Sequence, residues 1–186
     1  MSDIRTVIFT ADAVDRAGSA WAAASRGTVF PNFTFGELPR DHAAGGIPAA
    51  SGAADALGLI EAGALLVNVA SGPEGLDGAV AALEDGSPLR TVFALAAPDT
   101  LAFWGHGIAE GVAGKASAAH TDVLPTLAMV GEFLLSKAVE GRVLFEALRN
   151  PSYKQGQIGR LKAALARLEK VMKRSSQEPW DKHDCA

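Results

Sequence analysis

The sequence predicts an α/β fold with a mostly parallel sheet and helices on both faces. Short apolar runs rich in β-branched residues, typical of buried strands, alternate with Ala-rich stretches typical of helices. Parallel strands need crossover connections, so this alternation favours a parallel sheet covered by the helices that connect its strands. The 186 residues are enough for one domain with a substantial core.

The chain supplies these elements in a clear order. Strands are expected at residues 6–10, 65–69, 90–96 and 100–104. Helices are expected at residues 12–26, 53–62, 76–83, 122–130, 139–148 and 157–174, with Gly63 placed to end the second helix. Residues 27–48 contain repeated Pro and Gly and are expected to be mostly loop. We therefore expect an α/β domain at 1–150, an amphipathic helix at 151–174 and a disordered polar tail at 175–186.

Charge and composition exclude several classes of partner. The formal net charge of -4 gives no long-range attraction to nucleic acid or to an anionic membrane. No apolar run approaches the length that crosses a bilayer, and residues 1–5 do not resemble a signal peptide. The one cysteine, Cys185, excludes an intrachain disulfide. We expect a cytoplasmic protein that binds neither nucleic acid nor membrane.

Three segments carry motif-like patterns. Residues 27–34 read Gly-Thr-Val-Phe-Pro-Asn-Phe-Thr and are followed by Glu-Leu-Pro-Arg-Asp-His at 37–42 and by Gly-Ile at 46–47. Residues 101–108 form an apolar strand ending in Trp-Gly-His-Gly-Ile. Residues 120–127 read His-Thr-Asp-Val-Leu-Pro-Thr-Leu, and Glu-Gly-Arg-Val-Leu follows at 140–144.

These segments resemble, in the same order, the alkaline phosphatase and type I phosphodiesterase (nucleotide pyrophosphatase) superfamily. The first is similar to its nucleophile region, with Val29 as an insertion between Thr28 and Phe30. The second is similar to a strand ending in Trp-Gly-Pro-Gly-Ile, and the third to a Thr-Asp-(x)₂-Pro-Thr helix followed by Gly-Arg-x-Leu. The resemblance implies a shortened form of that superfamily's α/β core.

The resemblance also implies a chemistry, of which little remains in this sequence. In the superfamily two divalent metals, usually zinc, activate a Thr or Ser nucleophile and stabilise an in-line displacement. Thr28 matches the nucleophile, and Asp12, after the first strand, matches the first metal ligand. The expected Asp-(x)₃-His is replaced by Ser-Gly-Pro-Glu-Gly at 71–75, and the expected Asp-His by Ala-Pro-Asp at 97–99. The sequence thus keeps two of the roughly six or seven groups that form such a site, too few to hold two zinc ions in an ordered cluster.

Other polar residues offer weaker candidates. His106 replaces the Pro of the superfamily's Trp-Gly-Pro-Gly-Ile, and His42 lies with Asp41 in the nucleophile loop. A solvated turn residue at His106 and an exposed side chain at His42 are the simpler interpretations, because isolated histidines are weak metal signals. Asp122 and Thr126 belong to a motif interpreted as scaffold, which fixes a helix against the sheet.

Three hypotheses of function follow from the sequence. The leading one is a degenerate relative without two-metal hydrolase activity that acts in binding or assembly. The second is a hydrolase of phosphate or sulfate esters that uses Thr28 as nucleophile, and zinc or another divalent metal is implied only in that case. The third is a cleft near Thr28, Asn32 and His42 that binds a small anionic ligand.

The helix expected at 157–174 carries an apolar stripe, Ile158, Leu161, Leu165, Leu168 and Met172, opposite several basic residues. Two interpretations stay open. The helix lies on the surface of the domain with a solvated basic face, or it serves as a dimerisation helix, since the stripe approaches heptad spacing.

Overall fold

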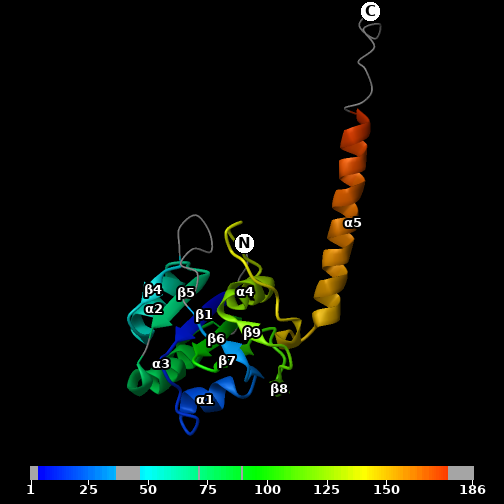
Figure 1. The fold of residues 1–186 in the computed structure, drawn as a ribbon. Helices are drawn as coiled ribbons and strands as arrows, with labels where there is room; N and C mark the ends of the chain where they lie inside the picture. The colour runs from blue at the N-terminus through cyan, green and yellow to red at the C-terminus, as the bar shows by residue number, and fades with distance from the viewer. Residues whose placement is uncertain (1–3, 37–46, 71, 89, 176–186) are drawn as a thin grey trace, which may run out of the picture. The chain divides into compact units, whose positions relative to one another are not determined.

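The computed structural model describes residues 4–36, 47–70, 72–88 and 90–175. The chain forms two compact units, Met1–Arg149 and Asn150–Ala186. The strands of the first unit are β1 Arg5–Thr10, β2 Thr28–Phe30, β3 Phe33–Thr34, β4 Ala49–Ala50, β5 Leu66–Ala70, β6 Thr91–Ala97, β7 Thr100–Gly105, β8 Val112–Ala113 and β9 Ala118–Ala119. Its helices are α1 Ser19–Ala24, α2 Ala53–Glu61, α3 Pro73–Gly86 and α4 Val123–Gly131, with 3₁₀ turns at His120–Asp122 and Phe145–Ala147. The second unit contains α5, Pro151–Ser175, labelled with the other elements in Figure 1.

A seven-stranded sheet in the order β4-β5-β1-β6-β7-β2-β8 organises the first unit. β4, β5, β1 and β6 are parallel neighbours, whereas β7 runs antiparallel to both β6 and β2. β2 and β8 are again parallel, and β3 pairs with β9 in a separate two-stranded sheet. The predicted α/β fold with a mostly parallel sheet is confirmed.

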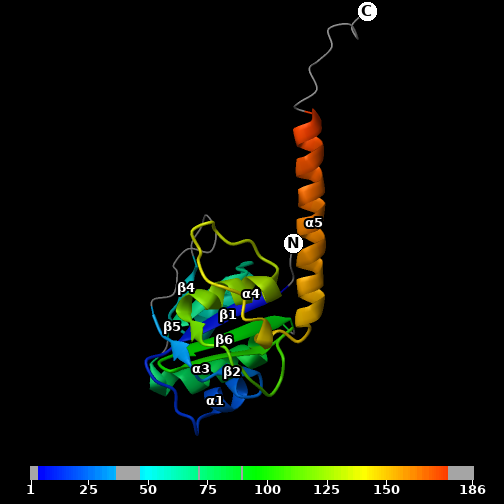
Figure 2. The ribbon, with the colours of Figure 1, turned by 45° about the vertical axis from the view of Figure 1, so that its right-hand side comes forward.

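Helices cover both faces of this sheet. Along β1 the side chains alternate, so that Val7 and Phe9 enter one core while Ile4 and Ile8 enter the other. The first core is completed by residues of α1, α2 and α3, and the second by residues of α4 and the segment after it. Figure 2 shows β1 and β6 between α4 on one side and α1 and α3 on the other. Burial on both faces explains why these strands read as nearly continuous apolar runs.

The predicted helix at 12–26 is wrong over its first half. Only α1, Ser19–Ala24, is helical. Asp15 stops the helix from starting earlier, because its Oδ1 accepts a hydrogen bond from the backbone N–H of Ala17 at 2.9 Å and closes a turn. The helix begins where Asp77 of α3 accepts the backbone N–H of Ala20 at 2.8 Å. A side chain from another helix therefore supplies the N-terminal acceptor that the local sequence lacks.

The expectation that residues 27–48 are mostly loop is also wrong in part, because β2 lies inside the sheet. Thr28 and Val29 pair with β7 on one side and with β8 on the other. The signal was present in the β-branched and aromatic run Thr-Val-Phe, but the Gly and Pro beside it masked it. Residues 37–46 of the predicted loop lie outside the described residues.

A group of hydrogen bonds, here called the α4 clasp, ties residues 141–144 to the start of α4. The Asp122 carboxylate accepts the backbone N–H of Ala119 at 3.1 Å and that of Arg142 at 2.8 Å. The Thr126 hydroxyl donates to the Asp122 carbonyl at 2.7 Å and accepts the backbone N–H of Leu144 at 2.9 Å. Thr126 is fully buried, so each partner replaces a hydrogen bond to water that burial removes.

The clasp explains why the predicted helix at 139–148 does not form. The backbone N–H groups of Arg142 and Leu144 bond to side chains of the preceding helix rather than to carbonyls four residues earlier. Gly141 adopts a φ of 107°, which a helix does not contain. Only the 3₁₀ turn Phe145–Ala147 remains of the predicted element.

The second unit contains the long amphipathic helix that the sequence predicts at 157–174. α5 runs from Pro151 to Ser175, so the helical pattern recognised at 157–174 extends back to Pro151, the first residue of the expected 151–174 segment, whose missing N–H is harmless in the first helical turn. Residues 176–186 of the predicted tail lie outside the described residues. No helix in the described part of the chain combines the length and apolarity needed to cross a membrane.

A pair of glycine substitutions tests the α4 clasp. Gly141 and Gly63 have similar left-handed φ values, 107° and 100°, so Ala at either site is expected to cost about 1–2 kcal/mol of backbone strain. A Cβ at position 141 would lie 2.2 Å from the carbonyl oxygen of Thr121, whereas at position 63 it would meet nothing within 4 Å. We expect Gly141→Ala to lower the free energy of unfolding, measured in urea, by about 1–3 kcal/mol more than Gly63→Ala. Equal losses would show that the clasp tolerates the displacement.

Candidate functional site

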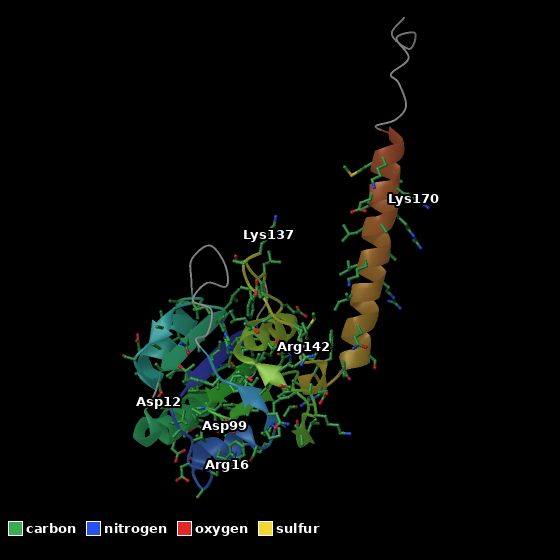
Figure 3. All side chains as sticks on the ribbon, in the orientation of Figure 1. Asp12, Arg16, Asp99, Lys137, Arg142 and Lys170 are labelled. Atoms are coloured by element: carbon green, nitrogen blue, oxygen red, sulfur yellow. The ribbon has the colours of Figure 1, made fainter. Side chains whose placement is uncertain are left out.

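The carboxyl ends of the parallel strands are the edge at which an α/β sheet ordinarily binds its ligand. β1 lies between β5 and β6 and runs parallel to both, so three carboxyl ends meet here. A cavity of about 300 Å³ opens at this carboxyl edge, lined by Thr10, Ala11, Asp12, Phe35, Ala70 and Gly72. The structure therefore places Asp12 where the resemblance expects the first metal ligand, and its side chain is exposed (Figure 3).

The donor groups at the carboxyl edge do not fit a two-metal site. Asp12 is the one acidic residue among those that line the cavity. Asp99, in the turn after β6, shares this edge with Arg16, whose guanidinium donates to the Thr100 hydroxyl at 3.3 Å (Figure 3). Within the described ranges no three His, Cys, Asp or Glu side chains gather as a metal site would require. Zinc needs at least three such ligands at about 2 Å, so these residues cannot supply one ordered ion, let alone two.

Thr28 lies inside the sheet and away from Asp12. Across the sheet Thr28 is level with Phe103 of β7, which is level with Ala94 of β6 and so with Ile8 of β1. Thr28 therefore lies at the level of the middle of β1. Three interstrand spacings, about 14 Å, separate it from β1. The side chain is fully buried, and its hydroxyl donates to the carbonyl of Ala109 at 2.9 Å. In this arrangement the hydroxyl links β2 to the segment that follows β7.

His106 lies at the opposite, amino edge of the parallel strands. β7 is antiparallel to β6, so its last residues stand beside the first residues of β6, and the His106 N–H donates to the Thr91 carbonyl at 2.9 Å. Thr91 is in turn level with Arg5, at the start of β1. The length of β1, about 20 Å, therefore separates His106 from Asp12. No metal cluster of the expected size, with ions about 4 Å apart, can include both residues.

A cavity larger than the one at the carboxyl edge lies at this amino edge. It measures about 510 Å³, and its polar lining consists of Arg26, Glu84, Ser87, Thr91, His106, Glu110 and Arg149. A volume of this size is ordinary for a small-molecule site. The amino edge, which the resemblance does not mark, thus offers more room and more polar groups than the carboxyl edge.

A chain of contacts orders one wall of the amino-edge cavity. The indole N–H of Trp104 donates to Glu84 at 2.8 Å, and both oxygens of Glu84 accept from Nη2 of Arg26, at 2.8 and 3.0 Å. Trp104 is itself held by stacking on Phe93, with ring centroids 5.3 Å apart. This wall therefore presents a guanidinium whose position is set by a buried aromatic stack.

The lining also includes Arg149, whose Nη2 contacts Glu110 at 2.5 Å. Ser87 contributes a buried hydroxyl for which the described structure gives no hydrogen-bond partner. Burial lowers the pKa of His106, and the positive charges of Arg90 and Arg149 lower it further, against a smaller opposing effect of Glu132. His106 is therefore a neutral imidazole at neutral pH, able to donate and to accept one hydrogen bond.

Asn32, another predicted residue, is not among those that line either of these cavities. Asn32 is exposed between β2 and β3, and its carbonyl accepts the N–H of Ala118 at 3.0 Å. His42 lies outside the described residues. No sequence motif links Arg26, Glu84 and Arg149, because they lie far apart along the chain. The one available signal was the Trp104 motif, whose indole needs a buried acceptor.

Comparison of the chain with protein-family models, with curated proteins and with solved structures finds no significant match.

The environment of His106 predicts a pH dependence of stability. Because its pKa is lower in the folded chain than the ordinary value of 6.5, the unfolded chain takes up a proton at higher pH than the folded chain does. The contribution of the neutral imidazole to stability is complete above about pH 7 and declines as the pH falls through the unfolded pKa. We expect the unfolding free energy of His106→Gln to decline less steeply than that of the native chain between about pH 7 and 5. Parallel curves in urea titrations would contradict this account.

Proposed function

We propose that this chain is a degenerate relative of the alkaline phosphatase and type I phosphodiesterase superfamily that lacks two-metal hydrolase activity and acts in binding or assembly. The observation that carries the proposal is the separation of Asp12, Thr28 and His106, which lie at the carboxyl edge, inside the sheet and at the amino edge. Two-metal catalysis needs its nucleophile and ligands in one cluster. The exposed carboxylate of Asp12 and the remote, buried hydroxyl of Thr28 do not form such a cluster.

The α4 clasp supports the relationship to the superfamily. Both halves of the motif on which the resemblance chiefly rests take part in it, since Asp122 and Thr126 bond to the backbone of Arg142 and Leu144. The two parts of the motif therefore act together, because their hydrogen bonds hold the segment at 142–144 against the start of α4. The same contacts support the scaffold interpretation, because the polar atoms of Thr126 are occupied inside the protein.

The alternative, a hydrolase with Thr28 as nucleophile, requires a different arrangement of this residue. Its hydroxyl would have to leave the carbonyl of Ala109 and become exposed from a strand paired on both sides. The paired backbone of β2 opposes that change, because exposing it breaks ladder hydrogen bonds with β7 and β8.

A second candidate function, the binding of a small anion, is favoured by the amino-edge cavity rather than by the cleft near Thr28, Asn32 and His42. Arg26 and Arg149 both line this cavity, and each is oriented by a carboxylate. The guanidinium fork is suited to carboxylate and phosphate groups. The neutral imidazole of His106 would donate one further hydrogen bond without adding charge.

Metal content and turnover test the main proposal. We expect the purified chain, saturated with zinc and then dialysed, to retain no stoichiometric pair of zinc ions, and Asp12→Asn to leave any turnover of aryl phosphates and phosphodiesters unchanged. Two bound zinc ions together with turnover that depends on Asp12 or Thr28 would refute the proposal.

Thr28 has a separate expected outcome, on stability. Thr28→Val removes the donor to the buried carbonyl of Ala109 and is expected to lower the free energy of unfolding by about 1–2 kcal/mol without affecting turnover. Thr34→Val, at an exposed strand position, is the matched control and should change it by less than about 0.5 kcal/mol. If Thr28→Val abolishes turnover while leaving stability unchanged, the hydrolase alternative is favoured instead.

The anion hypothesis is tested by thermal shift with inorganic phosphate and sulfate. Binding to the folded chain raises the melting temperature by mass action. We expect Arg149→Gln to remove the shift, and Lys137→Gln, which removes the same charge at an exposed site outside the cavity lining, to preserve it. An equal loss in both variants would indicate a general charge effect, and no shift in the native chain would end the hypothesis.

A further inference from the structure

The exposed apolar stripe of α5 is the largest apolar feature of the second unit. Leu161, Leu165, Leu168, Val171 and Met172 expose between 60% and 69% of their surface. Figure 3 shows the side chains of this helix, with Lys170 labelled. Water-exposed apolar stripes of this extent on a helix mark a surface that another element covers.

The spacing of the stripe matches that of a two-stranded coiled coil. Ile158, Leu165 and Met172 occupy one heptad position, a, while Leu161 and Leu168 occupy the other, d. The steps between successive members are three, four, three and four residues. A stripe that only met a flat protein surface would follow the helical period more loosely and would be wider.

Between Ile158 and Met172 no charged residue falls at a seam position, a or d. Arg160 and Arg167 fall at heptad position c, Lys173 at b and Lys170 at f, all of which point away from a facing helix. The two charged residues beside the seam, Lys162 and Glu169, both occupy position e and have opposite signs. A partner helix that brings one e position to the other would pair them.

We propose that α5 pairs antiparallel with α5 of a second copy of this chain, with Leu165 against the partner subunit's Leu168 and Leu161 against the partner subunit's Met172. In antiparallel pairs e positions face e positions, so Lys162 meets the partner's Glu169 and, by the two-fold symmetry, the reverse pair forms as well. This inference rests on the assembly role proposed above and names the partner in it.

A parallel pair would bury the same apolar residues but would not pair Lys162 with Glu169. There e faces g of the partner, so that Glu169 would lie beside the partner's Ala164 and no ion pair would form. The basic C-terminal ends of the two helices, which carry Lys170 and Lys173, would also lie at the same end of the pair. The antiparallel arrangement places the two basic ends apart.

An anionic membrane suits the helix less well. Helices that lie in the membrane interface usually carry Trp or Phe in the apolar stripe, whereas this stripe is aliphatic with one methionine. The membrane is therefore an outcome of the test rather than the proposal.

Cysteine cross-linking of the full chain distinguishes the orientations. In a Cys185→Ser background, Leu161→Cys and Met172→Cys are prepared as separate variants and oxidised alone and as a mixture. Antiparallel pairing holds residue 161 about 16 Å from its own copy, eleven residues along the helix, but against residue 172 of the partner. We expect disulfide-linked dimer from the mixture and little from either variant alone. Linked dimer from each variant alone would show a parallel pair and overturn the proposal.

Matched variants control for chance collision and for folding. Arg167→Cys lies at an outward position, so its mixture with Met172→Cys should give no linked dimer, and abundant dimer there would overturn the assignment of the seam. Sedimentation equilibrium should show a concentration-dependent dimer that Leu165→Glu abolishes, with the thermal unfolding of the chain retained. A native chain that stays monomeric, or that sediments only with anionic phospholipid vesicles, overturns the self-association. Neither result bears on the metal and turnover measurements, which decide the non-hydrolytic proposal independently.

Discussion

The layer that covers one face of the sheet depends on the hydrogen bonds between Asp122, Thr126 and the backbone at 142–144. On the other face α1, α2 and α3 share the burial of the strands, but on this face α4 is the only regular helix in the described part of the chain. Its continuation is irregular and cannot satisfy its own backbone. The side chains of Asp122 and Thr126 accept its backbone N–H groups instead. Leu144, Ala147 and Leu148 can therefore be buried in the core.

Strand register explains why small movements cannot bring Asp12, Thr28 and His106 together in one site. Asp12 follows β1, Thr28 lies across β6 and β7 from it, and His106 follows a strand that runs the other way. Each separation is a whole strand or several strand spacings, and a register shift would move every apolar side chain to the wrong face. The residues that resemble a catalytic set thus serve separate parts of the scaffold.

Local sequence patterns predicted the elements whose signals are local. The strand at Arg5–Thr10 and the end of α2 before Gly63 follow from apolar runs and from a left-handed residue, respectively. The elements that were wrong depend on distant partners. α1 starts at an acceptor on α3, and the helix expected at 139–148 yields its N–H groups to α4. No window along the chain contains both members of such pairs.

Composition and periodicity along the chain were enough to predict the α/β class and the amphipathic α5 with its heptad spacing. Motif comparison along the chain also showed that most of the metal ligands implied by the resemblance are missing. Tertiary structure was needed to locate Asp12, Thr28 and His106, to show that the motif at 120–127 forms the clasp, and to reveal the cavity at the amino edge. Arg26, Glu84, Trp104 and Arg149 meet there because strand pairing and helix packing bring distant segments together. Chain periodicity sets which face a residue takes, but pairing between strands sets its neighbours.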